Sequence, residues 1–260
     1  MSHSVRSRRG TAGVLFLILI AILSAAPAFA QTPAAPPPPP PPPPGWTGSF
    51  GAGLALTQGN SDTSTVNVAY DVLRDTGSPL LFKSTGLFIR GSSEGELTTN
   101  RLALDGRVDR ELGEMTSLFA QTQYLRDEFK EIDYLVSPTF GLSRFLVKNA
   151  RVELATDGGV GFVMEKNPGR EREASGAVTA GQNFKLKLSD TSQLIEKVSA
   201  LWKMDDFADG LYVFGLGVAA NITAGTQIKA ELLDTFKNRT PGPDVQKNDV
   251  AILLSFVYKY

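Results

Sequence analysis

Cysteine is absent from the 260-residue chain, and the single histidine is His3. Without cysteine no disulfide can form, so stability must come from the fold itself. Histidine usually activates a serine nucleophile or a catalytic water, and histidine and cysteine are the usual ligands of zinc and haem. No spacing suggests a Ser–Lys or carboxylate-only site in their place. The sequence therefore predicts that the protein is not an enzyme and has no catalytic, cofactor-binding or metal-binding residues.

Long hydrophobic runs are also missing: after residue 30, no stretch approaches the roughly 18 apolar residues that indicate a transmembrane helix. Residues 1–30 contain a basic segment, a short apolar run and a small-x-small site, which together are typical of a signal peptide. These three parts are Arg6 to Arg9, Val14 to Leu23, and Ala28-Phe29-Ala30. We therefore predict export through a cleaved signal that removes His3.

Positive charge is scarce in the mature chain. The signal holds three arginines and no acidic residue, so 23 basic residues remain against 27 acidic ones, a net charge of −4. Nucleic-acid binding depends on clustered positive charge. The sequence therefore predicts no binding of nucleic acid.

Proline is concentrated in residues 31–45, with an unbroken run of nine from Pro36 to Pro44. Consecutive prolines adopt polyproline II at about 3.1 Å per residue, so the run extends about 28 Å. We interpret residues 31–45 as a periplasmic linker that separates the signal from the following domain. The alternative is a ligand for a proline-recognising periplasmic partner of unknown identity.

From residue 46 to the end, patterned segments alternate with clusters of Gly, Pro, Asp and Asn. The pattern predicts twelve strands: 46–57, 64–74, 80–91, 99–110, 116–126, 132–144, 150–164, 174–186, 191–204, 210–222, 227–238 and 248–260. Their lengths of about 11–15 residues exceed those usual in soluble sheets and suit a tilted bilayer crossing, which needs about 9–11. The predicted fold class is all-β, with residues 46–260 forming a closed antiparallel transmembrane β-barrel of about twelve strands.

Apolar residues alternate with small or polar ones along these strands. The clearest row is Val250, Ile252, Leu254, Phe256, Tyr258 and Tyr260. A soluble sandwich turns such a row inward and a membrane barrel turns it outward. Small or charged opposite rows favour outward, as do Trp46, Tyr258 and Tyr260, which would form an interfacial girdle. Connections after odd strands, predicted at about seven residues against four or five after even strands, point the same way.

The rows predicted to face the lumen carry both signs of charge. They contain Arg101, Asp105, Arg107, Asp109, Glu153, Asp157, Lys197, Lys203, Lys229, Glu231 and Lys259, six basic and five acidic residues. A twelve-stranded barrel is wider than the eight-stranded kind that side chains fill. Mixed charges can therefore either cross-link the lumen or line an aqueous path. Near-neutrality favours internal pairing and a mostly occluded lumen.

Three strands depart from the pattern. Strand 80–91 mixes Lys83 and Ser84 with Leu81 and Phe82. Glu196 shares a row with Val198 and Trp202. Pro138 lies inside strand 132–144, where it removes a ladder donor and is expected at a bulge. In the same strand, Ile132 is predicted to share the outward row with Tyr134.

Two charged loops are candidate binding sites. Residues 205–210 carry three aspartates but lack the spacing of a calcium loop, which favours a solvated acidic loop. Arg170 to Glu173 alternate in sign, which favours a self-neutralised loop over a contact with lipopolysaccharide phosphate.

Two passages resemble a known family. Residues Gly51 to Thr63, with the core Gly59-Asn60-Ser61-Asp62-Thr63, resemble the opening strand and first loop of the salt-induced outer membrane proteins, domain of unknown function 481. Phe256 to Tyr260 resemble the signal by which outer-membrane barrels are handed to their assembly machinery. The resemblance covers residues 46–260 and implies an outer-membrane barrel without catalytic residues. Gly59-Asn60 itself is expected to be a structural hairpin tip.

These observations predict a non-enzymatic barrel of a Gram-negative outer membrane with both termini in the periplasm. Its expected role is an envelope or salt-stress-related structural protein, or a narrow, largely occluded channel. Its expected partners are outer-membrane lipid, lipopolysaccharide and, through the strand ending at Tyr260, the barrel assembly machinery. No cofactor is expected. The alternative is a soluble periplasmic β-barrel or sandwich that binds a small ligand.

Overall fold

A computed structural model describes residues 45–57, 63–242 and 245–260. The predicted signal peptide, nearly all of the proline linker and the Gly59-Asn60 hairpin tip lie outside these residues. No helix in the described ranges is long and apolar enough to cross a membrane.

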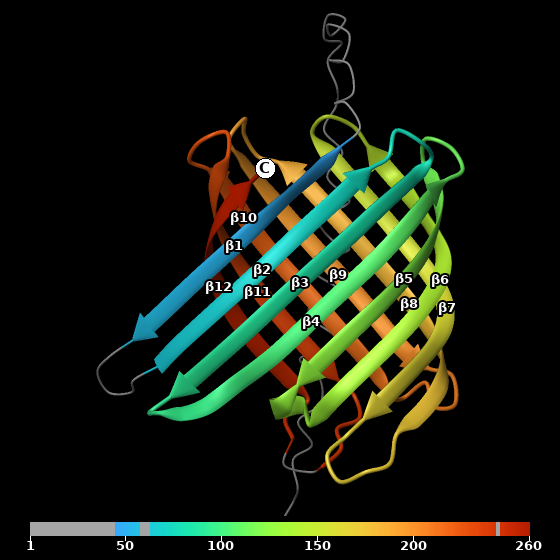
Figure 1. The fold of residues 1–260 in the computed structure, drawn as a ribbon, viewed down its shortest axis with the longest axis vertical. Helices are drawn as coiled ribbons and strands as arrows, with labels where there is room; N and C mark the ends of the chain where they lie inside the picture. Colours follow the sequence, from blue (N-terminus) through green and yellow to red (C-terminus); the bar gives the residue numbers. More distant parts are fainter. Residues whose placement is uncertain (1–44, 58–62, 243–244) are drawn as a thin grey trace, which may run out of the picture. The chain divides into compact units, whose positions relative to one another are not determined.

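Twelve antiparallel strands form a closed barrel within the described residues (Figure 1). They are β1 (Trp46–Thr57), β2 (Thr63–Asp75), β3 (Leu80–Ser93), β4 (Glu96–Glu111), β5 (Thr116–Asp127), β6 (Ile132–Lys148), β7 (Val152–Lys166), β8 (Glu173–Lys187), β9 (Ser192–Lys203), β10 (Gly210–Asn221), β11 (Thr226–Lys237) and β12 (Asn248–Lys259), with a 3-10 turn, η2 (Glu128–Lys130), between β5 and β6. Each strand pairs with its neighbours in sequence, and β1 pairs with β12, so no edge is left open. The predicted closed, twelve-stranded, all-β barrel is confirmed.

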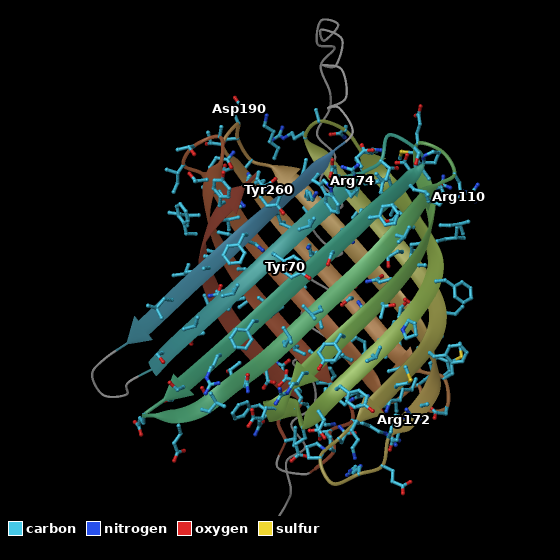
Figure 2. All side chains as sticks on the ribbon, viewed as in Figure 1. Tyr70, Arg74, Arg110, Arg172, Asp190 and Tyr260 are labelled. Atoms are coloured by element: carbon cyan, nitrogen blue, oxygen red, sulfur yellow. The ribbon has the colours of Figure 1, made fainter. Side chains whose placement is uncertain are left out.

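The connections differ between the two ends of the barrel. Among the described connections, the long-loop end carries 94–95, 128–131, 167–172, 204–209 and the described residues 238–242 and 245–247, and the short-turn end carries 76–79, 112–115, 149–151, 188–191 and 222–225. Arg110 and Asp190 mark the short-turn end in Figure 2, and Arg172 marks the long-loop end. The predicted asymmetry in connection length therefore holds for most of the loops.

One predicted loop is wrong. The sequence suggested a connection over residues 92–98, but β3 and β4 continue to a two-residue hairpin at Glu94 and Gly95. Both residues have positive φ, 53° and 83°, as tight turns that match strand twist require. Glycine adopts this conformation freely whereas glutamate rarely does. Because most residues of 92–98 are polar, the sequence does not show that the strands continue to a two-residue turn.

Large apolar side chains cover the outside of the barrel (Figure 2). In β12 the outward residues from Val250 to Tyr258 are 53–72% exposed, whereas the alternate residues Leu253 and Val257 are 3% and 6% exposed. A soluble sheet would reverse this pattern. Trp46, Tyr258 and Tyr260 are exposed at the short-turn end, as the predicted aromatic girdle requires.

Pro138 lies in β6 without the expected bulge. The β6–β7 ladder keeps one register on both sides of it, from Val136↔Met164 to Thr139↔Gly161. In that register Pro138 faces Phe162, and the Ser137 hydroxyl donates to the Phe162 carbonyl at 3.1 Å. The serine thus supplies a donor where proline has none, so the strand tolerates the proline without an extra residue.

The seam between β1 and β12 is the shortest of the twelve ladders. Four residue pairs, from Ser49↔Lys259 to Ala52↔Phe256, join these strands. Gly48 and Tyr260 extend the seam by exchanging two backbone hydrogen bonds of 3.2 and 3.1 Å. Beyond Ala52, the seam is held by Asn67 of β2, whose amide donates to the Leu254 carbonyl at 3.4 Å and accepts from the Ser255 hydroxyl at 2.7 Å.

Candidate functional site: the barrel lumen

The eleven charged residues predicted to face the lumen all lie in lumen-facing rows. Within each strand, they occupy the same alternating positions as the buried residues that pack inside the barrel, such as Leu201 in β9 and Leu233 in β11. The lumen has three levels: a charged network at the long-loop end, a middle region, and a mouth at the short-turn end.

The network at the long-loop end joins strands that are far apart around the barrel. We call it the cross-lumen network; it consists of Arg101, Asp127, Lys130, Glu165, Lys203, Asp209, Thr235, Lys237 and Asp249. Arg101 of β4 donates to the Thr235 hydroxyl of β11 at 2.5 Å, although five strand steps separate the two strands. Its guanidinium also lies 3.6 Å from Asp127. This contact therefore spans the lumen.

Glu165 is the centre of the network and is only 2% exposed. Its carboxylate lies 2.8 Å from the Lys237 ammonium of β11 and 3.0 Å from the Lys203 ammonium of β9. The two lysines also share Asp209, at 2.7 Å from Lys203 and 3.6 Å from Lys237. Two ammonium groups and two carboxylates thus balance one another at a buried site, which is the arrangement that makes a buried ion pair tolerable.

Lys130 forms a third link across the barrel and is fully buried. It belongs to η2, whose first turn is capped by the Asp127 carboxylate. The ammonium lies 2.9 Å from Asp249 of β12 and donates to the carbonyls of Gln246 and Lys247 at 3.0 and 2.9 Å. The loop between β5 and β6 is therefore fastened to the loop between β11 and β12.

Apolar clusters accompany the network. One contains Leu125, Ile132, Leu135, Val163, Ala177 and Leu201, and the other contains Ile89, Leu233 and Leu253. The second joins β3 to β11 and β12 and so also spans the lumen. Ile132 was predicted to face outward and is instead 1% exposed in the first cluster. The prediction is wrong because η2 and the register shift after Leu125 change the phase of β6 at its first residues.

The middle of the lumen is charged but less tightly linked. Arg107 of β4 donates to Asp109 at 2.8 Å, approaches Asp157 of β7 at 3.9 Å and lies over the Phe119 ring at 4.0 Å. Lys83 of β3 lies 2.9 Å from the same Asp109. Asp105 accepts from Gln121. These contacts lie on the wall formed by β3 to β7, so they do not cross the lumen as the network does.

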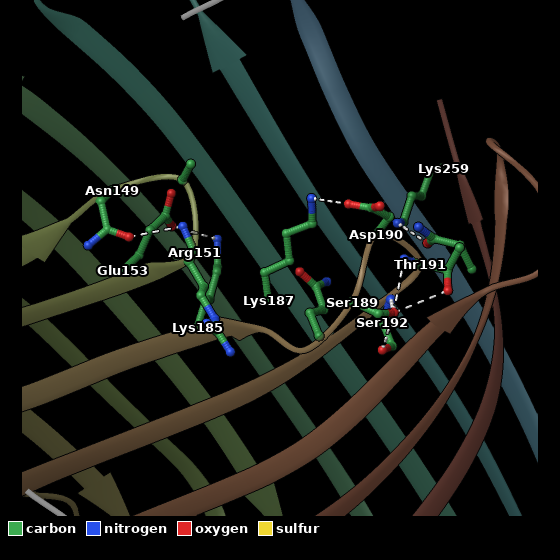
Figure 3. A pocket seen from close by; sticks show the side chains of 13 residues that line it. Asn149, Arg151, Glu153, Lys185, Lys187, Ser189, Asp190, Thr191, Ser192 and Lys259 are labelled. Carbon is green, nitrogen blue, oxygen red and sulfur yellow. Dashed lines mark hydrogen bonds and ion pairs between the residues drawn. The ribbon is translucent and has the colours of Figure 1, made fainter. Parts of the chain in front are cut away.

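A cavity of about 300 Å³ occupies part of the short-turn mouth (Figure 3). Its charged lining residues are Arg151, Glu153, Lys185, Lys187, Asp190 and Lys259. Lys187 donates to Asp190 at 2.7 Å, and this hydrogen bond holds the pKa of that exposed carboxyl below its usual range. Four basic and two acidic side chains make this mouth positive.

Charged residues of the two loops contact other parts of the chain. Asp206 pairs with Arg239 at 2.7 Å, Asp205 accepts from the Ser175 hydroxyl at 2.6 Å, and Asp209 belongs to the cross-lumen network. Over the described ranges, His, Cys, Asp and Glu do not gather in a group that could hold a metal ion. The expected self-neutralised loop is not what forms. Arg170 donates to the Pro241 carbonyl, and Glu173 lies 3.3 Å from Lys203.

Sequence reasoning missed several members of the network, among them Lys130, Glu165, Lys237 and Asp249. Three of these lie at ends of strands that were otherwise predicted well, in the lumen-facing row. Extending the alternation of each strand to its end would have identified Glu165, Lys237 and Asp249. It would not have identified Lys130, which lies in η2 and in no strand.

Solved structures with a similar fold are outer-membrane barrels. The NanC porin matches with a TM-score of 0.50 and 8% identity over 82% of this chain and 99% of that chain. The COG4313 outer membrane channel from Pseudomonas putida F1 matches with a TM-score of 0.52 and 13% identity over 84% of this chain and 96% of that chain. Identities this low indicate a shared fold alone. No curated protein matches the sequence.

A family profile described as "Protein of unknown function, DUF481" matches residues 50–260. The match begins in β1 and runs to Tyr260, so it covers nearly the whole barrel. It agrees with the resemblance carried by Gly51 to Thr63 and by the aromatic terminus. The chain belongs to the DUF481 family, and its barrel has the fold of outer-membrane channels.

Proposed function

We propose that the protein is a narrow outer-membrane channel whose lumen is occluded at the long-loop end by the cross-lumen network. The observation that carries the proposal is Glu165, which holds lysines from β9 and β11 inside the barrel. Ions that pass must displace or thread between these groups, so conductance is small or intermittent. Charges of both signs at this level give weak ion selectivity.

The proposed orientation has both termini and the short turns in the periplasm, with the long loops outside the cell. Short turns at one end, longer loops at the other and terminal strands that meet support it, because outer-membrane barrels share this arrangement. The aromatic girdle near Tyr260 then lies at the periplasmic interface, and lipid and lipopolysaccharide surround the outward apolar rows.

Planar-bilayer recording with the purified, folded protein tests the channel. We expect small or intermittent steps with little difference between cation and anion permeability. Large, steady and strongly selective steps would contradict an occluded lumen. In cells the protein should fractionate with outer membranes and change its apparent size on SDS gels after boiling, because closed barrels resist SDS.

A structural role in the envelope during salt stress is the second candidate. The same cross-lumen links favour it, because they brace opposite walls of the barrel. The family resemblance supports the connection with salt. A barrel that never conducts, in cells that lose envelope integrity at high salt when the protein is deleted, would favour this role over the channel.

The C-terminal residue provides a prediction on assembly. Tyr260 is 58% exposed on the outward face and its backbone pairs with Gly48 across the seam. Tyr260→Asp would place a charge at the membrane interface and remove the terminal aromatic that we expect the assembly machinery to recognise. We expect loss of most of the protein from the outer membrane, measured by fractionation and immunoblotting. Normal membrane levels would contradict the role, and Tyr260→Phe should keep them.

For the proline tract we predict no effect on assembly. If residues 36–44 are only part of a linker, deleting them should leave the amount of folded barrel unchanged, because strands β1 to β12 close the barrel among themselves. The measurement is the amount of heat-modifiable protein in outer membranes, that is, protein whose apparent size on SDS gels changes after boiling. A strong assembly defect would instead indicate that the tract binds a periplasmic partner.

A further inference from the structure

The cavity at the short-turn mouth is built from several separate elements. It is lined by the β6–β7 turn, the end of β8, the β8–β9 turn and the ends of β10 and β12 (Figure 3). Side chains from strands on different sides of the mouth therefore border one space. Its volume of about 300 Å³ suits a small molecule.

The carboxylates of the cavity already have basic partners. Glu153 lies 3.6 Å from Lys185, and Asp190 lies 2.7 Å from Lys187. Among the contacts within the described chain, the Lys259 ammonium donates to the neutral Asn221 amide at 2.9 Å, and the Arg151 guanidinium has no carboxylate partner. Arg151 and Lys259 therefore supply two positive charges that no acidic residue balances.

Neutral donors lie beside these two cations. Asn149 uses its side-chain oxygen to accept from the backbone amides of Arg151 and Val152, at 2.9 and 2.8 Å. Asn221 uses its oxygen to accept from Lys259. Each asparagine has its NH₂ group left over as a hydrogen-bond donor. The lining thus offers two cations and two amide donors to an acceptor-rich solute.

We propose that this cavity binds a small hydrophilic dianion, of the dicarboxylate class, with Arg151 and Lys259 as the two cationic contacts. The proposal rests on the channel function for its role, since such a site would concentrate anionic solutes at the proposed periplasmic mouth. Binding itself does not require the long-loop end to open. The cations come from the β6–β7 turn and from β12, so a solute with two separated anionic groups is the expected match.

Three matched probes test the proposal: succinate, succinamate and succinamide, which carry two, one and no carboxylates on the same carbon chain. They are titrated calorimetrically into the full-length mature protein folded in detergent, at pH 7 and low ionic strength. We expect succinate to bind about fivefold more tightly than succinamate, the upper range for one exposed ion pair, and succinamide to give no measurable binding. High salt should weaken succinate binding, because the site is open to solvent.

Two variants identify the contacts. Arg151→Ala and Lys259→Ala should each lower the succinate affinity about fivefold and remove the preference for succinate over succinamate. Lys148→Ala is the matched control, because Lys148 is an exposed cation at the same end that does not line the cavity. Its succinate affinity should equal that of the unaltered protein. Lys259 adjoins the terminal Tyr260, so Arg151→Ala keeps the test decisive if the other variant assembles poorly.

Equal binding of the three probes, or unchanged succinate affinity in both variants, would overturn the proposed site. These outcomes are separate from the failure of the channel. A protein that binds succinate but never conducts contradicts only the channel, and a protein that conducts but does not distinguish succinate from succinamide contradicts only this site.

Discussion

Glu165→Ala is expected to raise the single-channel conductance several-fold and to lower the free energy of unfolding of the barrel. Glu165 holds Lys203 and Lys237 at 3.0 and 2.8 Å, and all three side chains are less than a tenth exposed. Without the carboxylate, the two ammonium groups share only Asp209, and Lys203 keeps in addition the half-exposed Glu173 at 3.3 Å. Their repulsion and the volume lost would admit water and ions at the level that we propose occludes the lumen.

The expected loss of stability is about 3 kcal/mol, the lower range for removing one partner of a buried ion pair. Urea unfolding in detergent, followed by loss of the heat-modifiable band, measures it. Planar-bilayer recording of the same preparation measures conductance. The two effects have one cause, so they should appear together in this variant.

Glu153→Ala is the matched control. Glu153 is also a lumen-row glutamate paired with a lysine, but the Lys185–Glu153 pair is 3.6 Å long and about half exposed on both sides. Such a pair contributes at most about 1 kcal/mol. We expect little change in stability or conductance. An unchanged conductance in Glu165→Ala, with the barrel intact, would contradict occlusion by the network.

A quadruple variant separates charge from packing. Glu165→Met with Lys203→Met and Lys237→Met replaces the buried ions by apolar side chains of similar length, and Asp209→Asn removes the carboxylate that the two lysines share. Such replacements are often neutral or stabilising, because no buried charge is left unpaired. We expect stability near that of the unaltered barrel and a lumen that stays closed. A conducting quadruple variant would indicate that the charges, and not the filled volume, close the lumen.

The strands could be predicted from the sequence because their pattern is local. Period-two alternation in β12 places Ile252 and Leu254 on one face and Leu253 on the other without knowledge of any partner strand. The same rule placed the eleven charged residues in the lumen. It also placed Glu196 in the outward row of β9, where its carboxylate accepts a hydrogen bond from the Gln182 amide of β8 at 2.9 Å.

The cross-lumen contacts could not be predicted in the same way. Arg101 meets Thr235 across 134 residues, and this pairing depends on the stagger of every strand between them. Lys130 reaches Asp249 only because η2 folds a loop inward, and the left-handed Glu131 ends that turn. The same turn reverses the phase of Ile132. Alternation says which face a residue takes but not which residue it meets.

Gly53→Ala is expected to prevent normal closure of the barrel. Gly53 follows the last β1–β12 residue pair, and a Cβ added there would lie 1.8 Å from the Leu254 carbonyl oxygen and 2.6 Å from the Asn67 amide nitrogen. Real Cβ atoms do not approach backbone oxygens so closely, so β12 must move away from β1. That movement also breaks the Asn67 contacts to Leu254 and Ser255, which continue the seam beyond its four residue pairs.

We expect Gly53→Ala to lower the free energy of unfolding by about 3 kcal/mol, the upper range for overpacking, and to reduce the heat-modifiable protein in outer membranes. Gly106→Ala is the matched control, because a Cβ on that strand glycine meets nothing within 4 Å. Its stability and membrane level should match those of the unaltered protein. If both variants close equally well, the β1–β12 seam does not limit closure. If both fail, the loss reflects glycine replacement in general and not the contact with Leu254.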